Sequence, residues 1–238
     1  MLTKSPLEMV LDMRSPEGLG GHWLGVFVAV VNDIKDPDGQ GRVKVTLPWT
    51  QDTAGGSYET WARLATLMGG NNRGSWFIPD VNDEVLVAFE HGDPRRPYVI
   101  GALWNGSDAP PDSMDGAGNN YRKVLRSRNG VQLTMDDQDG QEKFIVETPG
   151  GQKITLKDGP GAVEIVDSNS NSIKLETSGI TIEASAQVTI RASQVTVSAG
   201  KVTVDAAAST FSGNIICQTL ISNSVVSGSY IPGAGNMW

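Results

Sequence analysis

The chain has 238 residues, a formal net charge of −8 and a sequence pI near 4.8, which argues against a general binder of nucleic acid or anionic lipid. Its 39% hydrophobic content allows a core, and its 28 glycines favour an all-β chain with many turns. Cys217 is the only cysteine, which excludes an intramolecular disulfide and a multi-cysteine metal site. No stretch approaches the about 18 apolar residues that cross a bilayer, and the charged amino terminus lacks a secretory-signal pattern. We therefore expect assembly in a cytoplasm.

Residues 1–21 are interpreted as an N-terminal arm that ends in the glycine-rich sequence SPEGLGG. Residues 22–107 then alternate as strands do, for example where Val43, Val45 and Leu47 share one face of GRVKVTLPW. The sequence Asp36-Pro37-Asp38-Gly39 has turn chemistry, because Pro fixes φ and Gly supplies a positive φ. About five strands bent by Gly and Pro predict a small closed barrel such as an OB-fold.

Three segments of this region, in order along the chain, resemble the OB domain of phage baseplate assembly V proteins, the central spikes of contractile tails. They are GVFVAVVNDIKDPDGQGRVKVTLPW, WARLAT and GGNNRGSWFIPDVNDEVLVAFEHGDPRRPYVIGALWNG. The features that carry the resemblance are Asp36, Gly41-Arg42-Val43, Pro48, the Trp61 segment, Gly74 to Phe77, Pro79, the Glu84–Phe89 strand, Gly92-Asp93-Pro94, Pro97 and Gly101. This family is related to the spike part of type VI secretion VgrG proteins. The resemblance implies a trimeric spike.

Residues 108–120 are a linker rich in Gly, Pro, Asn and Asp. Some members of the resembled family carry a lysozyme domain at this boundary, but residues 105–120 are far too few for a domain. Residues 121–150 predict a hairpin that leads into the C-terminal half, with VQLTM and KFIVET on either side of the turn DDQDG.

Residues 151–207 repeat an apolar–polar–apolar unit, as in GQKITLK and AQVTIRA. Because strand side chains alternate, both apolar residues of a unit lie on one face. The later units recur every seven or eight residues, which leaves a strand of about five residues and a short bend. We therefore predict an all-β chain in which an N-terminal OB-fold barrel is followed by a C-terminal intertwined trimeric β-helix, whose shaft is residues 151–207.

Two inward residues per unit cannot fill a coil made of one chain, and a one-chain ladder would expose its apolar face and strand edges. Three chains around one axis would share a core, so we expect a homotrimer. Burying one Val or Ile stabilises by about 1.5–3 kcal/mol, so this trimer should resist heat and detergent. The predicted trimer core comprises Ile154, Leu156, Val163, Ile165, Ile173, Leu175, Ile180, Ile182, Val188, Ile190, Val195, Val197, Val202 and Val204.

Residues 208–238 form the predicted apex, and no charged residue occurs from Ala206 onward. Alternation persists only in places, as at Ile215, Cys217 and Thr219. Related spikes often end in a His-x-His motif that holds iron, but no histidine follows His91, so we expect no metal site and no cofactor. Three alternatives are left for the tip: an apolar plug, the docking of a separate tip protein, or a frayed end. The residues expected to form the plug or to dock the partner are Tyr230, Ile231, Met237 and Trp238.

Catalytic motifs are weak throughout the chain, so we predict no catalytic residue and no enzyme. His22 and His91 are the only histidines, and a structural role is expected for His91 in its turn. The aspartates at 136, 137 and 139 resemble the start of a calcium loop, but Gln138 and Gly140 break the EF-hand pattern. The loop Gly69–Gly74 lacks the ending of a phosphate loop and is interpreted as a turn. Paired carboxylates for glycoside hydrolysis cannot be identified.

We interpret the chain as the central membrane-piercing spike of a contractile-tail baseplate. Its OB domain would dock under the tail tube and hub, and its needle would contact the target outer membrane transiently. The expected location is the virion tail baseplate, reached after assembly in the host cytoplasm. A tailocin or an extracellular contractile injection system is an alternative setting. The hub portion that precedes the OB domain in VgrG-like proteins is absent here, which favours the phage-type arrangement with a separate hub.

Two other classes of function are alternatives. An OB-fold nucleic-acid-binding protein could use Trp49, Trp61 and Trp76 as stacking platforms, but the acidic balance and the lack of a Lys/Arg stripe argue against a nucleic-acid partner. A receptor-binding or carbohydrate-active β-helix usually needs exposed aromatic residues or acid pairs along its shaft. Residues 151–207 contain no aromatic residue.

Overall fold

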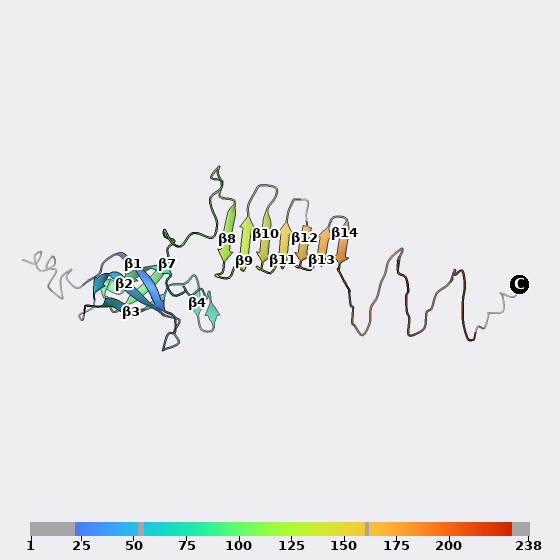
Figure 1. Cartoon of the computed structure of the whole chain (residues 1–238), viewed down its shortest axis with the longest axis horizontal. Coiled ribbons are helices and arrows are strands. Elements are labelled where there is room, and N and C mark those ends of the chain that lie inside the picture. Colours follow the sequence, from blue (N-terminus) through green and yellow to red (C-terminus); the bar gives the residue numbers. More distant parts are fainter. Residues whose placement is uncertain (1–21, 52–54, 160–161, 230–238) are drawn as a thin grey trace, which may run out of the picture. The chain divides into compact units, whose positions relative to one another are not determined.

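The computed structural model describes residues 22–51, 55–159 and 162–229. Within these ranges the regular elements are strands β1–β14 and one short 3₁₀ turn, so the predicted all-β class is confirmed (Figure 1). The N-terminal arm (residues 1–21) and the four predicted tip residues lie outside the described residues. No helix in the described part of the chain is long and apolar enough to cross a membrane.

Five strands close an N-terminal barrel in the order β1–β2–β3–β7–β6, which confirms the predicted OB-type barrel. Neighbouring strands pair antiparallel, except that β3 and β7 pair in parallel. The strands are β1 (Val26–Asp33), β2 (Val43–Gln51), β3 (Ser57–Leu64), β6 (Glu84–Phe89) and β7 (Pro97–Ala102).

Alternate residues of the strands fill the barrel, as the period of two requires. The largest fully buried side chains are Leu47, Val31, Val43, Val45, Val85 and Val87. Phe89 closes the core against an aromatic cluster, in which its ring centroid lies 4.9 Å from that of Trp23 in an edge-on arrangement. Phe27, Trp49 and Tyr58 complete this cluster. The barrel therefore has a core of its own.

Two turns of the barrel need glycine for steric reasons. The loop Gly69–Gly74 is a small hairpin of β4 (Gly69–Gly70) and β5 (Arg73–Gly74). A Cβ at Gly74 would lie 2.4 Å from the Met68 carbonyl oxygen. In the 3₁₀ turn Glu90–Gly92, a Cβ at Gly92 would lie 2.9 Å from the Leu24 side chain. The two histidines meet at this second turn, where His22 Nδ1 lies 3.1 Å from the His91 carbonyl oxygen.

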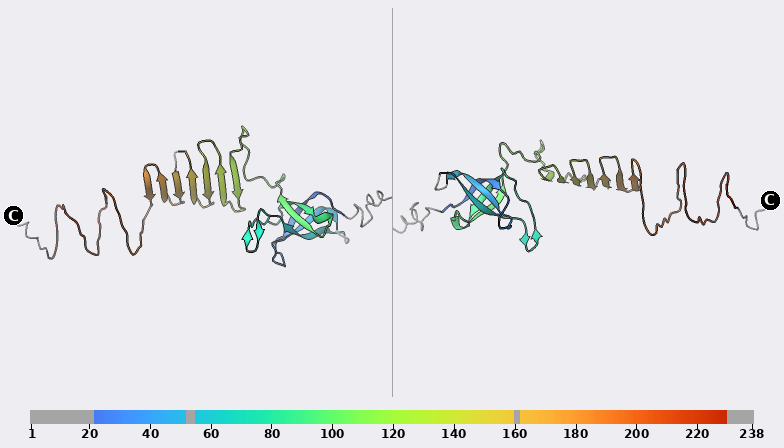
Figure 2. Two further views of the ribbon diagram at one scale, coloured as in Figure 1. Left: turned by 180° about the vertical axis from the view of Figure 1, so that it is seen from behind. Right: turned by 60° about the horizontal axis from the view of Figure 1, so that its bottom comes forward.

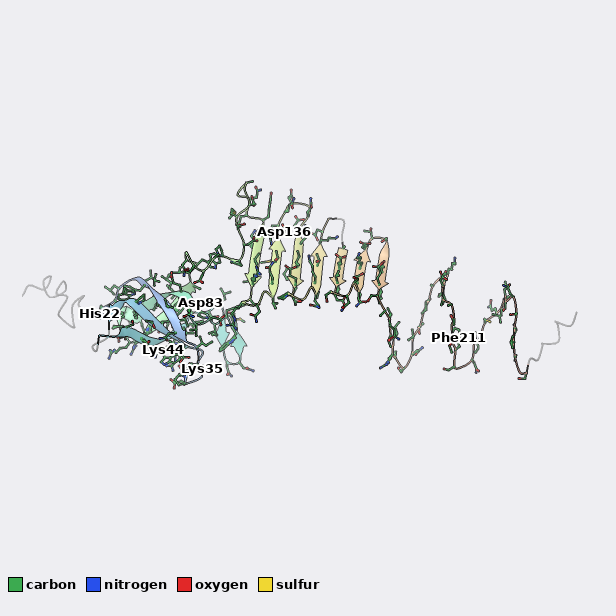
Figure 3. The ribbon with its side chains drawn as sticks, in the orientation of Figure 1. His22, Lys35, Lys44, Asp83, Asp136 and Phe211 are labelled. Carbon is green, nitrogen blue, oxygen red and sulfur yellow. The ribbon has the colours of Figure 1, made fainter. Side chains whose placement is uncertain are left out.

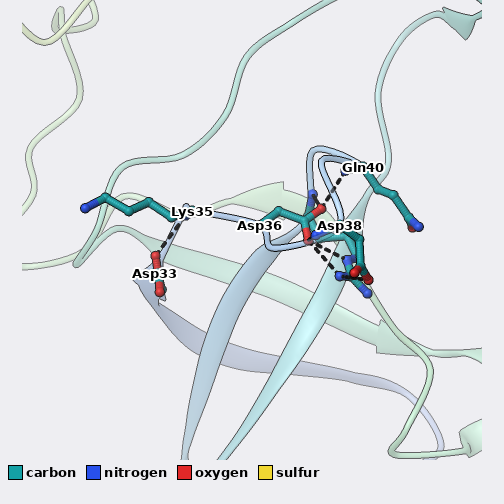
Figure 4. A network of polar contacts seen from close by, with 6 residues as sticks. Asp33, Lys35, Asp36, Asp38 and Gln40 are labelled. Atoms are coloured by element: carbon teal, nitrogen blue, oxygen red, sulfur yellow. Dashed lines mark hydrogen bonds and ion pairs between the residues drawn. The ribbon is translucent and has the colours of Figure 1, made fainter.

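The loop between β1 and β2 is held by the carboxylate of Asp36 (Figure 4). This carboxylate accepts hydrogen bonds from the backbone N–H groups of Asp38, Gln40 and Arg42. It also pairs with the Arg42 guanidinium, whose nearest nitrogen lies 2.6 Å from Oδ1. The hydrogen bonds from the Arg42 side chain are the main cause that holds the pKa of Asp36 far below its usual range, and the backbone donors lower that pKa further.

We expect the substitution Asp36→Asn to lower the melting temperature of the barrel by several degrees at pH 7, because asparagine removes the charge that pairs with Arg42. The pKa of Asp36 is lower in the folded than in the unfolded chain, so its stabilisation is present above the unfolded value of about 3.9 and is lost as pH falls through the folded value. The difference between the two proteins should therefore narrow below about pH 3.9.

Tryptophan fluorescence can follow this transition, since every tryptophan except Trp238 lies between residues 23 and 104. Asp38→Asn is the matched control, because Asp38 is 57% exposed and contacts the same guanidinium from the solvent side. A difference that stays constant down to pH 2 would contradict the assigned role of the Asp36 charge.

Seven five-residue strands form a second sheet in which each strand pairs antiparallel with the next along the chain. Figure 2 shows these strands in one layer. They are β8 (Arg122–Arg126), β9 (Gln132–Asp136), β10 (Lys143–Glu147), β11 (Lys153–Lys157), β12 (Ala162–Val166), β13 (Ser172–Glu176) and β14 (Gly179–Glu183).

The pairing within one chain ends at β14. A second compact unit starts at Val188. No strand occurs among the described residues 184–229, where the backbone runs back and forth (Figure 1). We call each extended segment between two bends of this region a leg. The predicted shaft is therefore divided. Its units up to Ile182 lie in strands, whereas those at Val188/Ile190, Val195/Val197 and Val202/Val204 lie in legs without a partner strand from the same chain.

Candidate functional site

One face of the seven-stranded sheet carries two rows of apolar side chains, of which one spans all seven strands and the other has Lys123 at its β8 end. In the antiparallel register Ile154 lies opposite Ile165, and the row continues through Ile173 to Ile182. Residues two apart on a strand share a face, so the neighbouring row lies beside it. We call the combined surface the apolar ladder; it consists of Leu125, Leu133, Met135, Phe144, Val146, Ile154, Leu156, Val163, Ile165, Ile173, Leu175, Ile180 and Ile182.

The apolar ladder is uncovered within one chain. Ile154 is 42% exposed, Leu156 45% and Ile180 70%. Soluble monomers rarely expose a contiguous apolar surface that runs across a whole sheet, and such surfaces usually mark a contact with another molecule. A long antiparallel sheet with an open apolar face also risks uncontrolled association. The ladder is therefore the strongest candidate for an interaction surface in the described part of the chain.

The opposite face of the same sheet is mostly polar, with Val124 and Ile145 as the apolar members of its central row. Its central row includes Thr134 and Thr155, which are buried although no second layer covers them, because they are short and lie between longer side chains. Further along this row, Lys174 Nζ lies 3.4 Å from Glu164 Oε1. Figure 3 shows Asp136 at the end of β9, beside the next turn. This face can remain exposed to solvent, whereas the apolar face of the sheet requires burial against a partner.

The structure brings together eight of the fourteen predicted trimer-core residues, from Ile154 to Ile182, on the ladder. The other six, from Val188 to Val204, lie on the legs and are all more than half exposed. Sequence reasoning missed the upstream part of the ladder, Leu125 to Val146, because this region was treated as a separate hairpin. The same period of two in VQLTM and KFIVE was the signal that could have included it.

The aromatic residues weighed as base-stacking platforms are partly engaged by neighbours. Trp49 stacks on Phe27 with ring centroids 4.8 Å apart, and its Nε1 donates to the Val28 carbonyl. The Arg42 guanidinium lies over the Trp61 ring, with its Cζ atom 5.7 Å from the ring centroid. Trp76 is 75% exposed, but its ring edge packs on Gly41. These contacts stabilise the barrel loops. Because neighbouring side chains pack on the rings of Trp49 and Trp61, neither ring offers an open platform for base stacking.

The acidic cluster in the turn after β9 serves the turn itself. The Gln138 backbone N–H donates to Asp136 Oδ1, and Lys123 Nζ lies 2.5 Å from Asp137 Oδ2. In the described residues there is no group of three or more His, Cys, Asp or Glu side chains that could hold a metal ion.

Two family models match the two structured parts of the chain. The type VI secretion system/phage-baseplate injector OB domain matches residues 27–104, and the phage baseplate V C-terminal trimerisation domain matches residues 143–208. The chain belongs to the phage baseplate V family. The first match coincides with the barrel. The second begins at β10, covers most of the apolar ladder, and continues into the legs as far as residue 208.

Several curated relatives are type VI secretion system spike proteins. The chain is 30% identical over 127 residues to VgrG1b of Pseudomonas aeruginosa, which covers 50% of the chain and 17% of that protein. It is 34% identical over 116 residues to VgrG5 of the same species (46% and 14%), and 30% identical over 115 residues to VgrG3 of Vibrio cholerae (46% and 11%). The chain thus spans less than a fifth of the length of these relatives.

Proposed function

We propose that three copies of this chain form the central puncturing spike of a contractile injection machine. The observation that carries the proposal is the apolar ladder on a single-layer sheet, most of which lies in a region that matches a trimerisation domain. Three such sheets arranged around one axis bury their ladders against each other and leave their polar faces in water. The spike's role is mechanical, and we propose no enzymatic step.

Burial of the ladders supports the stiffness that such a spike requires. Each Val, Ile or Leu moved out of water stabilises the assembly by about 1.5–3 kcal/mol. This gain is repeated along every strand of three chains, so it is large against the about 5–15 kcal/mol that holds a typical domain folded. The force for penetration comes from sheath contraction, and the chain supplies a rod that does not bend or unfold under load.

The barrels provide the attachment of the spike. We propose that they dock beneath the hub and tail tube, which is supported by the match of residues 27–104 to an injector OB domain. The exposed side chains of Leu67, Trp76 and Phe77 beside the β4–β5 hairpin offer an apolar contact for this docking. The expected location is the baseplate at the end of the tail, with transient contact to the target outer membrane. For residues 230–238 we retain the proposal of an apolar plug or a docked tip protein.

A complementation experiment in a strain that produces the contractile particle tests this function. Particles from a strain that lacks the gene should assemble without killing or infecting target cells, and a plasmid copy of the chain should restore the activity. A copy carrying Ile173→Asp in the ladder should fail to restore it, whereas Thr181→Asp, on the polar face of the neighbouring strand, should restore it. Full activity of particles without the chain would contradict the proposal.

A further inference from the structure

The legs beyond β14 change length at Ala207. Upstream, the backbone bends at Ser193, Gly200 and Ala207, a spacing of seven residues. Downstream, it bends at Ser212–Gly213 and then at Gln218, Asn223 and Gly228, so the bends from Gly213 onward are five residues apart. An extended leg rises about 3.3 Å per residue, so each downstream leg is shorter by about 7 Å. A coil built from the shorter legs is narrower than one built from the longer legs.

The sequence changes character one leg later, after the short leg of residues 208–211. The three legs that follow are NIIC, TLIS and SVVS, each with two adjacent apolar residues followed by Cys or Ser, and the sequence continues this pattern at Tyr230 and Ile231, outside the described residues. The expected single face of Ile215, Cys217 and Thr219 is wrong, because the bend at Gln218 places Thr219 on the next leg. Adjacent residues of an extended leg point to opposite sides. Each of these three short legs therefore presents one apolar residue to each side.

The two members of each apolar pair differ in exposure. The first members, Ile215, Leu220 and Val225, are 64%, 73% and 60% exposed. The second members are 96%, 93% and 98% exposed, and we call them the outer row: Ile216, Ile221 and Val226. If the first members face the axis of the trimer, as the Val/Ile pairs of the longer legs are proposed to do, the outer row lies on the outside of the spike.

The longer legs carry no such outer row. On the side opposite Val188 and Ile190, the first long leg has Gln187, Thr189 and Arg191, and the next two legs are equally polar there. The outside of the spike thus changes from polar and charged to uncharged with an apolar residue on each leg. Uncharged outer positions with aliphatic side chains are what strands in contact with lipid carry, because charges on a lipid-facing strand are costly.

We propose that the outer row is a lipid-contacting collar that lowers the free energy of the narrow end of the spike inside the hydrocarbon of a bilayer. This inference rests on the proposed trimeric spike. The row lies along the sides of three successive legs, so it fits a phase that surrounds the spike better than a protein that caps its end. The ligand class is the acyl chain of a membrane lipid.

A fluorescent probe at Ile221 tests the collar on the full-length chain. The only cysteine is first replaced by Cys217→Ser, which gives this leg the residue that the next two legs already have at the same place. Ile221→Cys is then labelled with an environment-sensitive dye. Vesicles of zwitterionic phosphatidylcholine neither attract nor repel the acidic chain, and adding them should shift the emission to the blue. Thr196→Cys, on the polar outside of a long leg, is the matched control and should show no shift.

The outcomes separate the collar from the spike itself. The labelled protein is first shown to be a trimer, and failure at this step would contradict the proposed function. A trimer whose Ile221 probe does not respond to vesicles would overturn only the collar. A blue shift without vesicles that grows with protein concentration would also overturn it, in favour of contact between spikes. The triple change Ile216→Ser, Ile221→Ser and Val226→Ser should keep the trimer and weaken vesicle binding by at least about tenfold; dissociation of that trimer would place the row in the core.

Discussion

The substitution Ile173→Asp should abolish the trimer. Ile173 lies in the middle of the apolar ladder, with Ile165 opposite it on one neighbouring strand and Ile182 on the other. A trimer would bring three new carboxylates into one apolar core without a partner, and an uncompensated buried charge costs about 3–5 kcal/mol. Every 1.4 kcal/mol corresponds to about a tenfold change in an equilibrium constant. The trimer's dissociation constant should therefore rise by more than about 100-fold.

Light scattering coupled to size-exclusion chromatography measures this loss directly. The matched control is Thr181→Asp, which adds the same charge on the polar face opposite Lys174. The control should remain trimeric, and the barrel should stay folded in both variants because its core is separate from the ladder. An intact Ile173→Asp trimer would show that the ladder is not the trimer interface.

The amide hydrogens of residues 188–206 should be protected from exchange by at least about 10³-fold in the assembled protein, and this protection should vanish when the trimer is lost. The physical reason is the backbone itself. Buried N–H and C=O groups are almost always hydrogen-bonded, but the legs in this range have no partner strand from their own chain. Strands from the two other chains must then supply the hydrogen bonds.

Hydrogen exchange followed by mass spectrometry resolves this range, with the Ile173→Asp variant as the dissociated state. Peptides from the barrel strands are the internal control. These strands hydrogen-bond to one another within one chain, so their amides should be protected in both proteins. Fast exchange of residues 188–206 in a verified trimer would contradict pairing between chains.

The barrel could be predicted from the sequence because two signals agreed. Alternation placed Val43, Val45 and Leu47 on one face, and all three are fully buried. The predicted turn residue Gly39 has φ of +64°. The β1–β2 loop is also held by the Asp36 carboxylate, but its partners Asp38, Gln40 and Arg42 lie two to six residues away, so periodicity gave no hint of this role.

The apolar face of the C-terminal sheet could be predicted in part. The units from Ile154 to Ile182 follow the period of two, and the register places them on one face. Periodicity cannot state which chain supplies the neighbouring strand. The loops between strands β8 and β14 contain two or more residues, which allows hairpins within the chain. After β14 most bends are single residues, which turn the backbone without forming a hairpin.

The outer row escaped the sequence reasoning because adjacent apolar residues such as Ile215 and Ile216 break the alternation. A search for a fixed repeat length would have found the spacing of five that the bends at Gln218, Asn223 and Gly228 confirm. The absence of charge after Asp205 was visible in the sequence. Its physical meaning depends on which side chains face outward.

The native mass of the purified full-length protein tests the central claim most directly. The apolar ladder and the partnerless legs both require three chains, so mass photometry or native mass spectrometry should give three times the chain mass of 25.3 kDa. That species should persist on a detergent gel that has not been boiled. A protein that is monomeric under native conditions, with its ladder open to water, would contradict the account.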